Sequence, residues 1–93
     1  FFGEWDVLLA PGEPMTAFPA EKSFADASWS DPVGAMGNVC GLPGISVPCG
    51  FGKNNLPAGL AMVGGAFAEE NVLTLARAFQ RTTDWHRRRP PIG

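Results

Sequence analysis

The chain has 93 residues, which is enough for one small domain that buries only a modest share of its surface. Its net charge of -2 provides no basic field for nucleic acid, and no segment is long and apolar enough to cross a membrane. Hydrophobic residues make up 45% and charged residues only 17%, a balance typical of the interior of a larger protein. We therefore expect a domain that is incomplete alone.

The N-terminal stretch FFGEWDVLLA contains the first predicted strand, over residues 6–10. It carries two acids and no basic segment, so we expect no signal peptide, and the missing initiator Met favours a chain cut from a longer one. The apolar run stops at Pro11, which indicates a short buried strand. Residues 11–30 show no periodicity yet carry large apolar side chains, so we predict a long loop that crosses a surface supplied by another part of a protein.

A short helix is predicted over residues 32–41. Asp31 suits the N-cap, Pro32 suits the first helical position, and Gly41 is a typical helix end before Leu-Pro. The glycines inside this helix cost up to about 1 kcal/mol each relative to alanine, so its stability must come from packing.

Two short apolar runs, residues 44–47 and 59–63, are bracketed by Gly and Pro and predict two strands. Pro48 is expected to end the first of them. A short polar turn separates the runs, which favours an antiparallel pair. Runs that are apolar on both faces are typical of a layered α/β sheet covered on both sides.

Residues 69–83 predict an amphipathic helix. Its apolar positions recur at helical spacing on one face, and they are Val72, Leu73, Ala76 and Phe79. Phe67 precedes the helix and is expected to pack on Val72 as a hydrophobic staple. Residues 84–93 are predicted to form an extended tail, whose three consecutive arginines we interpret as solvated.

Few side chains could carry chemistry. Cys40 and Cys49 fit neither a disulfide scaffold nor a zinc site, because His86 is the sole histidine. Free, mostly buried thiols in a reducing compartment are expected, which favours a cytoplasmic protein. A Cys49–His86 nucleophile–base pair is the alternative, although no orienting motif surrounds either residue. Ser46 lies inside a predicted strand, on the face opposite to Ile45 and Val47, with no base nearby in sequence.

Three stretches together resemble the C-terminal end of the amidase signature family: DPVGAMGNVCGLPGISVPCGF, LPAGLAMVGGAFAEENVLTLARAFQ and DWHRRRPP. The matching positions are Asn38, Gly41, Pro43, Ser46, Pro48 and Gly50, followed by Leu56, Pro57, Gly59, Leu60 and Gly64. The strand at 6–10, with Pro11 and Pro14, resembles the stretch Asp-x-Leu-Leu-x-Pro-x-x-Pro just upstream of that end. The departures are Val39 for the usual Leu, Met36 where Pro is common, and Gly12 where Thr is usual.

The resemblance implies an α/β fold in which short strands of a mixed sheet are packed by helices, with residues 1–93 as one C-terminal fragment. It also implies hydrolysis of a carboxylic amide to an acid and ammonia or an amine, by two serines and a lysine. In the family these residues lie upstream of this end, and no serine or lysine here sits in a matching motif. We therefore expect no catalytic residue, no metal and no cofactor in this chain, and no activity of the chain alone.

One acid could reach a substrate. In the amidotransferase branch of the family, an acid just before the equivalent short helix binds the substrate's ammonium group. Asp31 matches that acid by spacing, seven residues before Asn38. The alternative is the N-cap already described, which is supported because an Asp-Pro pair also looks usual in ordinary amidases.

Three interpretations remain open. The first is part of an amidase, the second is a fragment similar to the A subunit of a glutaminyl-tRNA amidotransferase, and the third is a non-catalytic interaction module. The tail DWHRRRPPIG resembles that of free-standing amidases, which favours the first. The expected partner is the remainder of the parent amidase, with self-association as the alternative, and neither nucleic acid nor a membrane is expected to bind.

Overall fold

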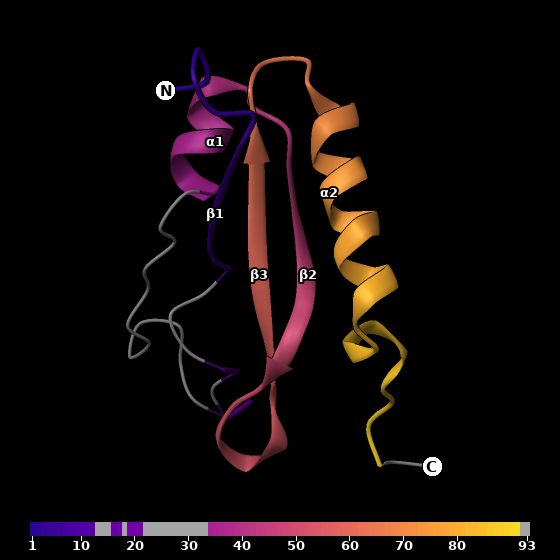
Figure 1. Ribbon diagram of the computed structural model, residues 1–93. Coiled ribbons are helices and arrows are strands. Elements are labelled where there is room, and N and C mark those ends of the chain that lie inside the picture. Colours follow the sequence, from indigo (N-terminus) through magenta and orange to yellow (C-terminus); the bar gives the residue numbers. More distant parts are fainter. Residues whose placement is uncertain (13–15, 18, 22–33, 92–93) are drawn as a thin grey trace.

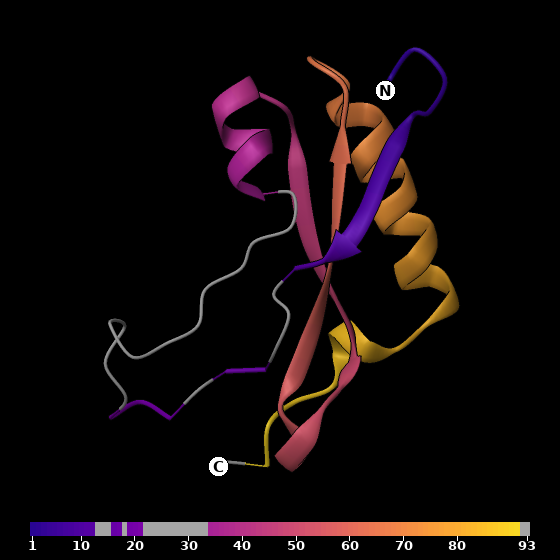
Figure 2. The same cartoon turned by 90° about the vertical axis from the view of Figure 1, so that its left-hand side faces the viewer.

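The computed structural model describes residues 1–12, 16–17, 19–21 and 34–91 (Figure 1). Its strands are β1 (Val7–Pro11), β2 (Gly44–Phe51) and β3 (Pro57–Gly64), its α-helices are α1 (Gly34–Cys40) and α2 (Glu69–Thr82), and its 3-10 turns are η2 (Lys53–Asn55) and η3 (Trp85–Arg87). The strands form a sheet in the order β1-β3-β2. Helix α2 lies along one side of this sheet and α1 lies on the other side, at one end (Figures 1 and 2).

The predicted antiparallel pair is confirmed. In β2, Ile45 lies opposite Met62 and Val47 lies opposite Leu60 on β3. β1 is also antiparallel to β3, so the described part of the sheet is not mixed as expected. The short link between β2 and β3 explains the antiparallel direction of that pair, because a parallel neighbour requires a crossover of a dozen or more residues. The connection from β1 to β3 is long, so the direction of β1 is set by tertiary packing and not by a link.

β2 continues through Pro48 to Phe51, so the prediction that Pro48 ends the strand is wrong. The Gly64 N–H donates to the Pro43 carbonyl (3.0 Å). In an antiparallel pair every second residue points its main-chain groups toward the partner strand, so the odd-numbered residues of β2 before the bulge face β3 and the even-numbered ones face away. Pro48 pairs with Gly59 at a position whose main-chain groups point away from β3. No ladder bond is lost there, so an edge strand accommodates proline. A bulge follows, between Pro48 and Gly50.

The core lies between α2 and the sheet. Met62 is only 1% exposed, and it clusters with Val47, Val72 and Ala76. The next residue, Val63, points to the opposite face, where a β-carbon on Gly37 of α1 would be 3.8 Å from its Cγ1. The two faces of β3 are therefore covered by different helices.

The amphipathic helix is confirmed over Glu69–Thr82, but two of its predicted contacts are wrong. Leu73 is 59% exposed, and Leu75 packs against the core in its place. Leu73 follows the buried Val72 by one residue, which turns its side chain about 100° around the helix axis. Phe67 has a left-handed backbone conformation, with φ of 62°, and its side chain is 92% exposed. The predicted staple on Val72 is therefore not formed.

The predicted end of the first helix is confirmed. Gly41 has φ of 69°, and the Leu42 N–H donates to the Gly37 carbonyl at 2.8 Å. This is the bond of a Schellman motif, whose left-handed residue is usually glycine. The predicted start of this helix and the loop over residues 11–30 fall largely outside the described residues.

The prediction that the whole tail is extended is wrong, because Trp85–Arg87 form a 3-10 turn. The Arg87 N–H donates to the Asp84 carbonyl (3.0 Å) and the Arg88 N–H to the Trp85 carbonyl (3.3 Å), which forms η3. The prolines that suggested an extended tail restrict themselves and Arg89, the residue before them, all of which lie after η3. Among the described residues, no helix is both long and apolar enough to span a bilayer.

Candidate functional site

The side chains with nucleophilic chemistry are spread over the sheet and its ends. Ser46 is exposed on β2, on the face turned away from α2. Cys49 is half-buried beside the bulge in the same strand, and Cys40 is exposed at the end of α1. Both thiols are free, as expected. The expectation of burial is wrong for Cys40, because the last turn of α1 faces away from the sheet.

Cys49 and His86 do not form a nucleophile–base pair in the described structure. His86 belongs to η3, which packs against β2. Its Nδ1 is buried without a hydrogen-bond partner, so no bond joins this nitrogen to the Cys49 thiol. A general base must lie within hydrogen-bond reach of the proton that it accepts, at about 2.6–3.2 Å. In the described structure, the half-buried thiol of Cys49 is therefore not activated through His86 Nδ1.

Two glycines lie close to the Ser46 hydroxyl, although the residue as a whole is exposed. A β-carbon at Gly59 would approach the Ser46 Oγ to 2.8 Å, and one at Gly12 would approach it to 3.2 Å. These two glycines bring β1 and β3 close to the hydroxyl of β2, and the Gly12 N–H donates to the Gly59 carbonyl at 2.9 Å. Among the described residues no hydrogen bond joins Ser46 to a base. The surroundings fit a packing role better than that of a nucleophile.

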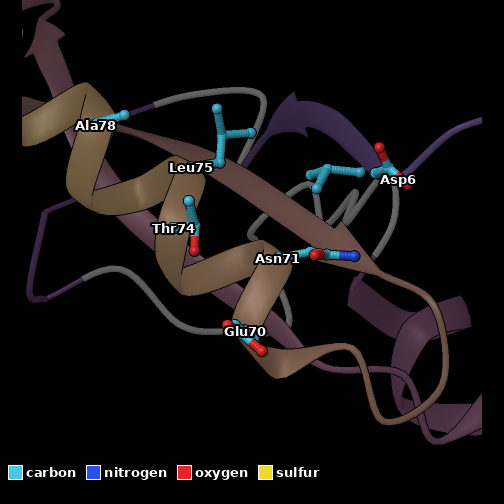
Figure 3. A pocket seen from close by; sticks show the side chains of 7 residues that line it. Asp6, Glu70, Asn71, Thr74, Leu75 and Ala78 are labelled. Atoms are coloured by element: carbon cyan, nitrogen blue, oxygen red, sulfur yellow. The ribbon is translucent and has the colours of Figure 1, made fainter.

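A shallow hollow lies between the start of β1 and α2 (Figure 3). It has a volume of about 440 Å³ and is lined by Asp6, Val7, Glu70, Asn71, Thr74, Leu75 and Ala78. The hollow is open to solvent, whereas small-molecule sites bury most of their ligand. Periodicity could not reveal this hollow, because it exists only once α2 crosses the sheet. In the described part of the chain, no group of three His, Cys, Asp or Glu side chains could hold a metal.

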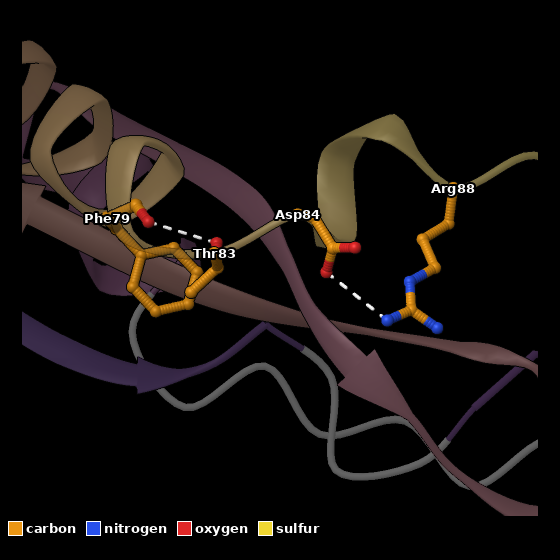
Figure 4. Close-up of polar contacts among 4 residues, drawn as sticks. All are labelled: Phe79, Thr83, Asp84 and Arg88. Carbon is orange, nitrogen blue, oxygen red and sulfur yellow. Dashed lines mark hydrogen bonds and ion pairs between the residues drawn. The ribbon is translucent and has the colours of Figure 1, made fainter.

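The end of α2 and the tail are joined by polar contacts (Figure 4). The Thr83 Oγ1 donates to the Phe79 carbonyl at 3.0 Å, which satisfies one of the last carbonyls of the helix. Arg88 forms an ion pair with Asp84 at 3.3 Å, and both side chains are at least half exposed. Such an exposed pair contributes at most about 1 kcal/mol to stability.

Aromatic packing anchors the tail to β2. The rings of Phe51 and Trp85 meet edge to face with centroids 6.0 Å apart, and the Arg88 guanidinium lies 4.9 Å from the centre of the Trp85 ring. The tail thus contacts the last residue of β2 through Trp85. Sequence reasoning missed this contact because it treated the arginines as solvated and did not consider Trp85.

We expect Phe51 and Trp85 to be energetically coupled by about 0.5–1.5 kcal/mol, the usual value for an aromatic pair. A double-mutant cycle with Phe51→Ala and Trp85→Ala, measured by urea unfolding, checks this value. Arg88→Ala is the control, since an exposed cation–π contact contributes only about 0.5–1 kcal/mol. A coupling energy near zero would contradict the anchor.

Asp31, the candidate for substrate binding, lies outside the described residues. Of the other positions that match the family pattern, Gly41, Gly59 and Gly64 all serve backbone geometry or close packing. The described residues thus form a packed scaffold that carries no complete catalytic site.

Comparisons with known proteins give a consistent result. A family model described as Amidase matches residues 1–73. The A subunit of glutamyl-tRNA(Gln) amidotransferase from Synechococcus sp. (strain JA-3-3Ab) is 44% identical over 94 residues, which covers 99% of this chain and 18% of the relative. The protein of the same name from Cupriavidus metallidurans is 42% identical over 92 residues, covering 96% of this chain and 18% of the relative. The chain thus spans about a fifth of the length of these curated relatives. No solved structure gave a significant match.

Proposed function

Because this chain belongs to the amidase family, we propose that it is part of an enzyme that hydrolyses carboxylic amides to an acid and ammonia or an amine. The observation that carries the proposal is the family match over residues 1–73, supported by relatives aligned over nearly the whole chain. The chain contributes sheet and helices to that enzyme, and free thiols are in keeping with a cytoplasmic location.

The catalytic groups of the proposed reaction lie outside these residues. Amide hydrolysis needs a nucleophile activated by a neighbouring base, and donors that stabilise the oxyanion. Ser46 packs against glycines, and Cys49 has no hydrogen bond to His86 Nδ1. We assign the two serines and the lysine of the mechanism to the remainder of the parent enzyme. Asp31 is retained as a proposed contact to a substrate ammonium group, with the N-cap as its alternative role.

A second candidate function is that of one component of an amidotransferase. The relatives described above are A subunits of glutamyl-tRNA(Gln) amidotransferases, and one match covers 99% of this chain. A match of that extent includes nearly all of the tail, so the tail is also compatible with an amidotransferase component. The two candidates share the chemistry at the amide and differ in the acceptor of the released ammonia.

A chimera tests the proposal. These 93 residues replace the matched segment of the A subunit from Synechococcus sp. (strain JA-3-3Ab), and the product is assayed for ammonia release from glutamine and from simple aliphatic and aromatic amides. Hydrolysis by the chimera is the expected result. Formation of Gln-tRNA in the presence of the partner subunits would support the amidotransferase role. A folded chimera that hydrolyses no amide, beside an active parent, would contradict the proposal.

The 93-residue chain by itself is expected to release no ammonia from the same amides, because its described residues hold no activated nucleophile. The matched variants are Ser46→Ala, Cys49→Ser and His86→Ala. Turnover that survives repurification and is lost in one of these variants would overturn the expectation and would place a catalytic residue in this chain.

A further inference from the structure

The outer face of α2 carries an apolar side chain that the packing of this chain does not use. Leu73 is 59% exposed, whereas Leu75 packs against the core. In Figures 1 and 2, no other described helix or strand lies outside α2. A single exposed leucine is ordinary on a protein surface, so the charges around Leu73 decide whether this face fits a partner.

Two of these charges form a row on the side of the helix turned away from Val72, which is buried against the sheet. Glu70 and Arg77 are both exposed, and they are seven residues apart. Seven residues make almost two full turns at 3.6 residues per turn, so the two side chains lie one above the other. Leu73 and Thr74 lie halfway along this row, one on either side of it.

The stability of α2 itself explains only part of this charge pattern. Glu70 in the first turn and Arg81 in the last turn complement the helix dipole, whose effect falls off within one turn of each end. Arg77 lies further inside the helix, beyond that range. Arg81 follows it by four residues, and like charges at this spacing slightly destabilise a helix. The position of Arg77 therefore has a cost to α2 that a carboxylate from another helix would offset.

The row is self-complementary when two copies of α2 lie antiparallel. A two-fold axis that passes between Leu73 and Thr74 is equally far from Glu70 and from Arg77. It therefore places Glu70 of each copy beside Arg77 of the other, which gives two ion pairs from one arrangement. The Leu73 side chains cover each other at the centre. An isologous contact of this kind closes on itself, so assembly stops at a dimer.

We propose that α2 is a dimerisation helix, which pairs with α2 of a second copy in the antiparallel register that joins Glu70 to Arg77. The helix has 14 residues and is therefore about 21 Å long. One helix pair covers much less than the roughly 800 Å² per partner of a standard interface. The dimer is accordingly weak, forms at high protein concentration, and dissociates when salt screens the two ion pairs. This inference concerns assembly and goes beyond the proposed function.

Charge exchange in the full-length chimera described above tests the register. The dimer dissociation constant is measured by sedimentation equilibrium at an ionic strength of about 0.1 M. Glu70→Arg and Arg77→Glu should each weaken the dimer about tenfold, because each turns both ion pairs into like-charge contacts. The double variant exchanges the two charges, so it should dimerise as the unsubstituted chimera does. An equimolar mixture of the two single variants should form heterodimers for the same reason.

Two further variants make the test specific. Leu73→Ala should also weaken the dimer, because it removes the apolar contact at the two-fold axis. Lys53→Glu makes the same charge change as Arg77→Glu at an exposed position outside α2, so it should alter the dissociation constant by no more than about twofold.

Three results would overturn the proposal. They are a chimera that stays monomeric at about 1 mM, a dimer that the reversals at Glu70 and Arg77 leave unchanged, and a double variant that fails to recover dimerisation. None of these readouts depends on amide hydrolysis. An inactive chimera that dimerises as expected would therefore contradict the proposed function and support the assembly.

Discussion

Replacing Met62 with alanine is expected to lower the free energy of unfolding by about 2–5 kcal/mol, which is the usual cost of truncating a buried Met or Leu. Met62 is 1% exposed and lies where α2 crosses β3, in contact with the cluster of Val47, Val72 and Ala76. Among the described residues few other buried side chains surround Met62, so these have little capacity to close around the cavity. Urea unfolding followed by tryptophan fluorescence measures the change.

The matched control is Leu73→Ala, which removes comparable apolar volume from an exposed position of α2. Its effect should stay within about 0.5 kcal/mol, as is usual for surface substitutions. Equal losses in the two variants would show that Met62 is not held in a packed core. They would also indicate that Leu73 belongs to the buried apolar face of the helix, as the sequence predicted.

Gly64→Ala is expected to lower the free energy of unfolding by about 1–3 kcal/mol through overpacking. A β-carbon at Gly64 would lie 2.8 Å from the Val72 Cγ2 and 3.3 Å from the Ala68 carbonyl oxygen. Val72 is buried and β-branched, so it cannot turn away without strain. Gly64 thus permits the close approach of α2 to β3 at the start of the helix. Thermal or urea unfolding of the variant measures the cost.

Two variants make this test specific. Gly3→Ala places a methyl group where no atom lies within 4 Å, so it should be nearly neutral. In a Val72→Ala background the clashing Cγ2 atom is absent, and Gly64→Ala should then cost less than it does alone. Additive losses in the double variant would contradict the steric explanation, since residues in contact are expected to couple.

These predictions concern packing because the described residues form a scaffold. The chain holds free thiols and one serine on the sheet, yet no hydrogen bond of the described structure activates any of them. This agrees with our proposal that the catalytic groups belong to the remainder of the parent enzyme and that this chain positions strands and helices against them.

The local elements could be predicted because short-range signals specify them. The Gly41 helix end, the antiparallel pair and the helix of residues 69–83 follow from turn residues and apolar periodicity, and the structure confirms all three. The family resemblance rested on the same turn glycines and prolines at fixed spacing, and the match to the amidase family confirms it. Chain stereochemistry and hydrophobic spacing act over a few residues, so the sequence alone carries them.

Errors arose where a neighbour distant in sequence decides the outcome. Pro48 did not end β2, because whether a proline interrupts a strand depends on which edge faces the partner. Leu73 and Phe67 are exposed because the position of α2 on the sheet selects Leu75 for the core and leaves the turn before the helix in a left-handed conformation.

By itself, the sequence determined which segments form strands and helices and which family the chain belongs to. Only the tertiary structure decided which face of α2 is buried, that Ser46 lies against Gly12 and Gly59, and that a hollow forms between the start of β1 and α2. The physical reason is that propensity and periodicity act along the chain, whereas burial and edge pairing are set by contacts between segments that the chain order does not specify.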